Sequence, residues 1–224
     1  MGEGDWSTTA PTIKDVGEIS VSVKAENVNY ETATNSYTLK VTPKAAVVKA
    51  TASQKTYGEA DPTLASTVEG LVTGESETLI ARTVTRATGE NVGTYTITAS
   101  GEASQGNYSV TYETATFTIA KAAVAVKADD KEQVYGAAAT ALTATVTGKP
   151  ESGDAVNYTL SRAEGDDVGE YAISVNLGEN PNYEITTTSG TYTIKKATFT
   201  VAGTNYEDVY DGASHGAAAV PTVT

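Results

Sequence analysis

The sequence predicts an all-β protein made of small tandem modules. Three observations lead to this fold class. Short stretches alternate between apolar and polar residues and are rich in Thr, Val, Ile and Tyr; a helical period is nowhere sustained; and several short motifs recur in the same order along the 224 residues. Period-two alternation is the pattern of a half-buried β-strand, and motifs at a fixed spacing indicate tandem repeats.

An Asp/Asn-Val-Gly turn is the clearest repeated motif, and its glycines Gly17, Gly93 and Gly169 are evenly spaced along the chain. Three further markers follow in a fixed order: an Asn-Tyr pair, a strand closed by Lys-Ala, and a phrase that begins Tyr-Gly or Tyr-Asp-Gly. The Asn-Tyr pairs start at positions 29, 107 and 182, and the last phrase starts at positions 57, 135 and 210. Four markers in one order predict a repeated structural unit.

The markers divide the chain into four segments. Residues 44–120 and 121–195 are complete repeats, residues 1–43 are the C-terminal part of a repeat, and residues 196–224 are the N-terminal part of another. Together the two partial copies are about as long as one repeat. Three explanations stay open: the fragment is out of phase, the structural unit is offset from the sequence unit, or the partial repeats of two molecules complete each other in a head-to-tail association.

The strand after each Asp/Asn-Val-Gly turn alternates between residues of its two faces. Tyr171, Ile173 and Val175 are expected to face one side of a sheet, and Ala172 and Ser174 the other. At the junction of the two complete repeats, the run TIAKAAVAVKA passes from one strand to the next without Gly, Pro or a Ser-rich linker. A taut junction limits hinge freedom, so we expect the modules to be stiffly arranged end to end.

The turn itself suggests a type of module. Tyr95 follows Gly93 by two positions and Tyr171 follows Gly169 likewise, whereas the first copy has Ile19. The arrangement resembles the tyrosine corner of immunoglobulin-like sandwiches, in which the hydroxyl bonds back to nearby backbone. This resemblance implies Ig-like β-sandwich modules, with a plain hairpin turn before a core Tyr as the alternative. Because the repeat is short for the seven strands of such a sandwich, β-grasp-like modules without a long helix are the alternative fold.

Composition excludes several classes of partner. The formal net charge is −13, which disfavours nucleic acid and anionic membranes, because phosphate binding requires clustered Lys and Arg. The chain has no Cys, so disulfides and Cys-ligated metals are excluded. No stretch approaches the roughly 18 apolar residues of a membrane span. The start MGEGDWSTTAP does not resemble a signal peptide. We therefore expect no membrane insertion by this fragment, with anchor and signal outside it.

The sequence offers no catalytic, cofactor or metal site. His215 is the only His and sits in a Gly-flanked turn, so a triad or a His-based metal site would rest on it alone. The acidic clusters lack the alternating spacing of a Ca²⁺ loop, and no phosphate-binding glycine motif occurs. We expect a protein that is not an enzyme and that carries no cofactor.

One set of equivalent positions carries large side chains that differ between the copies. Trp6, Arg82 and Tyr158 recur at the spacing of the motif glycines and lie just ahead of the repeated turn. Aromatic and Arg side chains dominate binding hot spots, so these three are candidate ligand contacts. The alternative is that each covers the edge of its own small core.

The motif order also resembles a known family. K-A-x-V-x-V, then Y-G, then D/N-V-G-x-Y-x-I, then N-Y-x-I and Y-T-I-K-K is similar to the MBG-type (YGX) repeats of bacterial surface proteins. The phrase VYDGASHG at 209–216, and residues 1–43, look more like the related YDG-type repeat. This resemblance implies an extracellular location at the bacterial cell surface, in an adhesin-like protein.

The leading functional hypothesis is a non-catalytic stalk fragment of such an adhesin-like protein. In the first alternative, the repeats themselves bind a host or microbial glycan or mucin through the three candidate contacts. In the second, the chain is an accessory module of a secreted polysaccharide-degrading enzyme. Fold and module type do not decide among these hypotheses.

Overall fold

The structure is a computed structural model that describes residues 11–203, 207–216 and 219–223. It is all-β: in these residues there are strands and one 3₁₀ turn, and no α-helix. Contacts divide the chain into two compact units. Residues 1–55 and 60–119 form the first, and residues 56–59 and 120–224 form the second.

The first unit holds an N-terminal hairpin and the first full repeat, whose last residues and residues 56–59 are grouped with the second unit. The strands of the hairpin are β1 (Gly17–Asn27) and β2 (Tyr30–Val41). Those of the first full repeat are β3 (Lys44–Ala50), β4 (Ser53–Thr56), β5 (Ser66–Glu69), β6 (Thr83–Arg86), β7 (Gly93–Ser100), β8 (Ser104–Gln105), β9 (Tyr108–Glu113) and β10 (Ala115–Ala120), with the 3₁₀ turn η1 (Glu77–Leu79) between β5 and β6.

The second unit holds the second full repeat and a C-terminal hairpin. The strands of the second full repeat are β11 (Ala122–Ala128), β12 (Lys131–Val134), β13 (Ala144–Thr147), β14 (Tyr158–Arg162), β15 (Gly169–Leu177), β16 (Tyr183–Thr188) and β17 (Gly190–Lys195). Those of the C-terminal hairpin are β18 (Phe199–Gly203) and β19 (Ala219–Val223).

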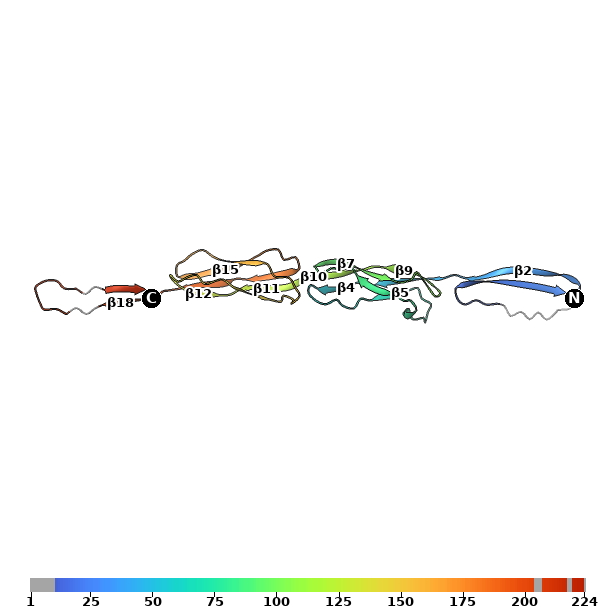
Figure 1. Cartoon of the computed structure of the whole chain (residues 1–224), viewed down its shortest axis with the longest axis horizontal. Coiled ribbons are helices and arrows are strands. Elements are labelled where there is room, and N and C mark those ends of the chain that lie inside the picture. Colours follow the sequence, from blue (N-terminus) through green and yellow to red (C-terminus); the bar gives the residue numbers. More distant parts are fainter. Residues whose placement is uncertain (1–10, 204–206, 217–218, 224) are drawn as a thin grey trace. The chain divides into compact units, whose positions relative to one another are not determined.

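Each full repeat consists of two small sheets. The orders are β5-β3-β9-β8 and β4-β10-β7-β6 in the first full repeat, and β13-β11-β16 and β12-β17-β15-β14 in the second. The strands of each repeat run along a common direction (Figure 1). The two repeats therefore share one strand order, apart from the short edge strand β8.

A parallel pairing closes each full repeat. β9 lies parallel to β3 with Tyr108 opposite Lys44, and β16 lies parallel to β11 with Tyr183 opposite Ala122. The strand that begins at the Asn-Tyr pair thus joins the first strand of its own repeat. This pairing brings the two ends of the repeat sequence into one sheet.

The core of each repeat lies between its sheets, as the alternating sequence requires. In β11 every second residue is buried from Ala122 to Ala128, and the residues between them are exposed. The buried core of the first repeat includes Ala46, Val48, Ile80, Ala99, Tyr108 and Val110, and Ile97, Phe117 and Ile119 are buried as well. That of the second contains Ala128, Ile173, Tyr192 and Ile194. These cores are small, so each module has a modest reserve of stability.

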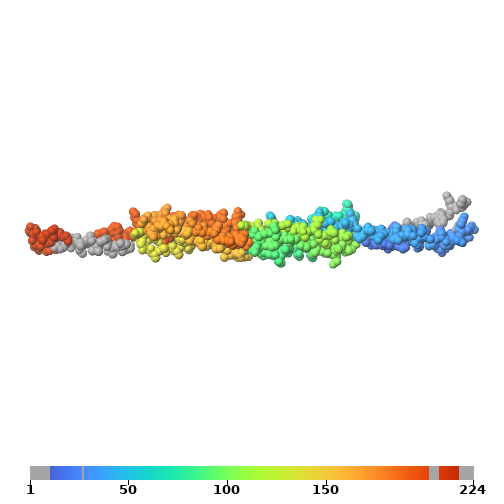
Figure 2. Space-filling model, turned by 90° about the horizontal axis from the view of Figure 1, so that it is seen from above, coloured from blue at the N-terminus to red at the C-terminus, as the bar shows by residue number. Residues whose placement is uncertain are grey.

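The two terminal segments are bare hairpins. β1 pairs with β2 along its whole length, with one irregularity near Ala25, and β18 pairs with β19. Neither pair belongs to a larger sheet in the described residues. Figure 2 shows the N-terminal hairpin in blue as narrower than the first full repeat in green. A two-stranded sheet is marginally stable alone, because it has no second layer on which to bury apolar surface.

Candidate functional site

The repeated turn is held by its tyrosine. The hydroxyl of Tyr95 donates to the carbonyl oxygen of Asn91 at 2.7 Å, and that of Tyr171 donates to the carbonyl oxygen of Asp167 at 2.9 Å. Each ring thereby fixes the loop that precedes its own strand. This is the back-bond that defines a tyrosine corner.

The glycines that make room for these rings are not those of the motif. A Cβ on Gly89 or on Gly165 would lie 2.3 Å or 2.2 Å from the adjacent tyrosine ring, and both residues have positive φ. A Cβ on Gly93 would meet nothing within 4 Å, and one on Gly169 would be 3.9 Å from Tyr171. Gly89 and Gly165 were not singled out from the sequence, although they too recur at the repeat spacing.

An arginine covers the other face of each tyrosine. The guanidinium of Arg86 lies 5.6 Å from the Tyr95 ring centroid and 4.9 Å from that of Phe117. In the second repeat, Arg162 lies 5.2 Å from the Tyr171 ring and 4.9 Å from that of Tyr192. Such cation–π contacts stabilise the packing of the turn against the sheet.

In the first repeat an ionic network surrounds this arginine. Asp61 accepts from Arg86 Nε at 2.5 Å and pairs with Lys55 Nζ at 2.8 Å, and Glu90 pairs with both cations. The hydrogen bond from Arg86, followed by that from Lys55, holds the pKa of Asp61 at about 2. Lys55 and then Arg86 likewise lower the pKa of Glu90. All four groups are satisfied by one another, so this network is structural.

The second repeat lacks part of this network. Its turn after β12 matches the turn after β4, and Ala139 occupies the place of Asp61. Arg162 pairs with Asp166, but its Nη1 atom is buried without a hydrogen-bond partner among the described residues. In the first repeat the Nη1 atom of Arg86 donates to the backbone oxygens of Ala87 and Gly89, while Asp61 accepts from Nε and Nη2.

The three candidate ligand contacts fall in different surroundings. Trp6 lies outside the described residues. The guanidinium of Arg82, just before β6, donates to Ser66 Oγ at 2.8 Å and to the backbone oxygen of Glu77 at 2.8 Å, so it joins β5 to η1. Tyr158, at the start of β14, is partly buried opposite Leu177. Arg82 belongs to the first unit and Tyr158 to the second.

The Tyr-Gly phrase after β4 forms a contact within the second unit. Tyr57 is only 6% exposed, and its ring meets that of Tyr183 edge to face at 5.4 Å between centroids. Its hydroxyl accepts from the backbone N–H of Asp154 at 3.2 Å. Gly58 is required here, because it has a φ of +83° and a Cβ would lie 2.4 Å from Pro150. The phrase thus packs against the Asn-Tyr pair that opens β16.

The Asp-Val-Gly turn contacts an Asn-Tyr pair too, inside the first unit. The backbone N–H of Val16 donates to Asn107 Oδ1 at 2.8 Å, and Asn107 Nδ2 donates to Asp15 at 2.9 Å. The repeated motifs, far apart in sequence, are therefore contact partners. The turn and the Tyr-Gly phrase form one end of a repeat, here named the Tyr-Gly end, and the Asn-Tyr pair marks the Asn-Tyr end.

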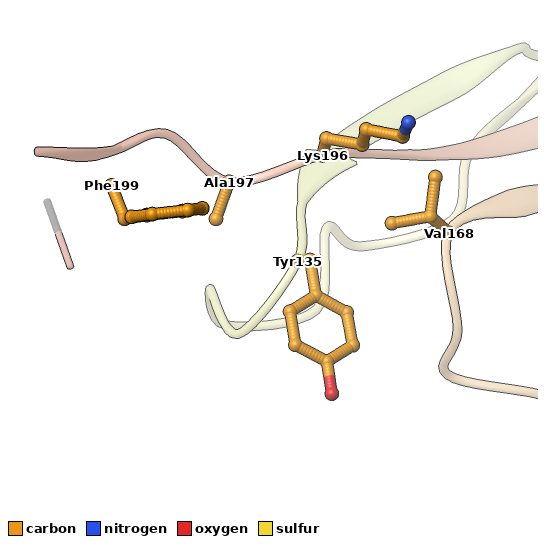
Figure 3. A pocket seen from close by; sticks show the side chains of 5 residues that line it. All are labelled: Tyr135, Val168, Lys196, Ala197 and Phe199. Atoms are coloured by element: carbon orange, nitrogen blue, oxygen red, sulfur yellow. The ribbon is translucent and has the colours of Figure 1, made fainter. Parts of the chain in front are cut away.

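At the Tyr-Gly end of the second full repeat this surface is open. Tyr135 makes the same backbone bond as Tyr57, to the last strand of its repeat, yet it is 51% exposed. It borders a cavity of about 330 Å³ whose lining is almost wholly apolar. Figure 3 shows Ala197 on the segment between β17 and β18 and Phe199 at the start of β18, with Tyr135 and Val168 also around the hollow. The fifth lining residue is Lys196.

Comparison with known families agrees with this architecture. The family described as MBG domain (YGX type) matches residues 46–118 and 124–193, which are the two full repeats. The chain therefore belongs to the MBG domain family. Such repeats are non-enzymatic modules typical of extracellular surface proteins. No curated protein matches the chain.

Two further observations bear on chemistry. Within the described residues, no group of three or more acidic or His side chains is placed to hold a metal ion. In the same part of the chain, no helix has the length and apolarity needed to cross a membrane. The feature that the geometry defines is the partly exposed apolar hollow at the Tyr-Gly end of the second full repeat.

Proposed function

We propose that the chain is a non-catalytic stalk segment of a bacterial cell-surface, adhesin-like protein. The observation that supports this proposal is that the repeated motifs contact one another. Tyr57 is buried against Tyr183, and the turn at Val16 is bonded to Asn107. Residues that recur in the copies form contacts of the array itself, which is what a stiff spacer requires.

A distance measurement tests this function. Because the chain has no Cys, dyes can be placed on Thr85→Cys and Glu184→Cys, one exposed position in each full repeat. Single-molecule energy transfer should give one narrow distance distribution. Tyr57→Ala should broaden it, because the edge-to-face contact and the hydroxyl bond are lost. Tyr135→Ala, in the same turn but exposed, is the matched control and should leave it narrow. A broad wild-type distribution would rule out a stiff stalk.

The alternative that the repeats bind glycan or mucin needs a separate experiment. Its contacts would be Trp6, Arg82 and Tyr158. The bonds of Arg82 to its own repeat favour a structural role for that residue. We expect no binding to a panel of mucins and glycans. Saturable binding that the triple variant W6A/R82A/Y158A loses would make the repeats the adhesin instead.

The accessory-module alternative depends on domains beyond these residues. It predicts a catalytic domain in the same parent chain, and gene context would reveal one. The stalk hypothesis predicts further repeats of the same type there.

A further inference from the structure

The C-terminal hairpin contains an incomplete copy of the repeat sheet. Ala197 and Tyr210 are spaced in the sequence as Ala122 and Tyr135 are, so β18 corresponds to β11 and β19 to β13. β11 is paired on both sides, with β13 and in parallel with β16. Within the described residues β18 is paired on one side only, with β19. Its second edge is therefore an open template for a parallel strand.

The side chains of β18 show the apolar surface that this open edge leaves in water. Phe199 is 63% exposed and Val201 is 61% exposed, whereas Val124 and Val126, at the matching places in β11, are buried. Phe199 also lines the apolar hollow beside Tyr135. Removing such apolar surface from water favours association. Phe199 belongs both to the exposed face of β18 and to the lining of the hollow.

The strand type that β18 lacks is present at the other end of the chain. β9 and β16 each begin at an Asn-Tyr pair, and β2 begins at the third such pair with Tyr30, which is exposed. In the full repeats this strand leaves β7 or β15 and joins the other sheet. In the N-terminal hairpin, β2 instead stays paired with β1 to their ends. In the full repeats the matching pairing ends at Ile97 opposite Ala115 and at Ile173 opposite Gly190, the places of Val21 and Tyr37 in the hairpin.

We propose that the two hairpins complete one repeat between two copies of this chain. Residues 30–34 of one copy add in parallel to the open edge of β18 in the other. Tyr30 lies opposite Ala197, in the register of Tyr183 opposite Ala122. Its ring packs at the hollow beside Tyr135, as the ring of Tyr183 packs on Tyr57. This association does not depend on the stalk function.

The geometry makes the contact heterologous. Each copy offers a donor strand at one end and an acceptor strand at the other, so association continues as an open chain of copies. The net charge of −13 on each copy opposes it. Salt screens exposed charges beyond about 8 Å at about 0.15 M, so association strengthens as salt is raised.

Light scattering over a range of concentrations, at about 0.15 M salt, tests the inference. The mass of the wild-type chain should rise with concentration. Val201→Lys removes the acceptor and Tyr30→Asp removes the donor, and each variant alone should stay monomeric. Mixed together, they retain one competent end each and should form a dimer of one copy of each. Leu79→Lys, which places the same charge on another exposed apolar residue, should associate like the wild type.

Two outcomes would overturn the inference. One is a wild-type mass that stays monomeric at every concentration and salt level. The other is growth that both end variants leave unchanged, because association would then use another surface. Both substitutions lie in the hairpins, so unfolding of the full repeats, followed by circular dichroism, shows that each variant is folded.

Discussion

The two arginines beneath the repeated tyrosines differ in how well they are paired. Arg86 has carboxylate partners in Asp61 and Glu90, while Arg162 pairs with Asp166 and has Ala139 at the place of Asp61. A hydrogen bond between charged groups contributes to the free energy of folding, and Ala139 cannot supply one. The second repeat therefore has a position at which stability can be gained by one substitution.

Ala139→Asp is that substitution. It places a carboxylate where the first repeat has Asp61, which accepts there from Nε and Nη2 of the arginine. We expect the free energy of unfolding of the second repeat to rise by about 1 kcal/mol. Urea denaturation measures this change. Ala138→Asp adds the same charge one residue away and should give no gain; an equal gain from both would assign the effect to charge alone.

Gly165 and Gly169 should differ in how much stability is lost when each is replaced by alanine. A Cβ on Gly165 would lie 2.2 Å from the Tyr171 ring, at a φ of +133°. We expect Gly165→Ala to cost about 2 kcal/mol or more, because the backbone is strained and the tyrosine is displaced. Gly169→Ala has ordinary contacts and should cost less than about 1 kcal/mol. If denaturation midpoints show the reverse order, the motif glycine is the constrained one.

The sequence predicted only some of the residues that hold the repeated turn. The motif glycines and tyrosines stand out because they share a recognisable turn pattern. Gly89 and Gly165 sit in loop stretches without such a pattern, and Arg86 and Arg162 look like exposed charges. These glycines and arginines also recur at the repeat spacing. The spacing alone does not show which glycine lies against a tyrosine ring, because that depends on the packing of the loop.

At the scale of elements, the ionic network links the loop after β4 to β6. Asp61 has a folded pKa of about 2 against an ordinary value of 3.8. A lowered carboxyl pKa contributes stability above the unfolded value, and this is lost as pH falls from about 4 to 2. Since Asp61 is 38% exposed, solvent screening reduces the contribution to about 1 kcal/mol.

The matching experiment compares the wild type with Asp61→Asn. Chemical denaturation of the first repeat should show a stability difference at pH 5 that is much smaller at pH 2, where the Asp61 carboxyl group is about half protonated. An NMR titration of the Asp61 carboxyl group reports its pKa directly. A midpoint near the ordinary value would show that the network does not hold the charge.

The existence of most strands followed from the sequence, and their order did not. Alternation in β7, β9 and β15 predicts half-buried strands because one face must meet a core. The parallel pairing of β3 with β9 joins residues far apart in the sequence, such as Lys44 and Tyr108. No local pattern encodes such a partner, since tertiary packing selects it. Local sequence also did not predict that β2 is one continuous strand, whereas each full repeat has two strands, β9 and β10 or β16 and β17, in the matching stretch.

At the scale of the whole chain, stability should be distributed unevenly. The full repeats have buried cores, whereas β1–β2 and β18–β19 are two-stranded sheets. Amide hydrogen exchange should therefore be at least about a hundredfold faster in the hairpins than in β7 or β15, because local opening there costs little. Protection as strong as in the full repeats, measured on dilute monomer, would contradict this distribution.

Family membership was predictable from the sequence, because it rests on motifs that are printed in the chain. Function was predictable only to the level of the repeat module and its family. The open surface at Tyr135 was not predictable, since Tyr57 occupies the same turn and is buried. Only the neighbours of a repeat decide which of its tyrosines is covered.

The pairing of repeated motifs has a consequence for how such an array changes over generations. Because the Tyr-Gly end of one copy fits the Asn-Tyr end of another, gain or loss of one whole repeat by recombination leaves every junction with a matching pair. Array length can vary between lineages without any compensating mutation. Natural selection can therefore change the length of the array without changing the residues that each repeat needs in order to fold.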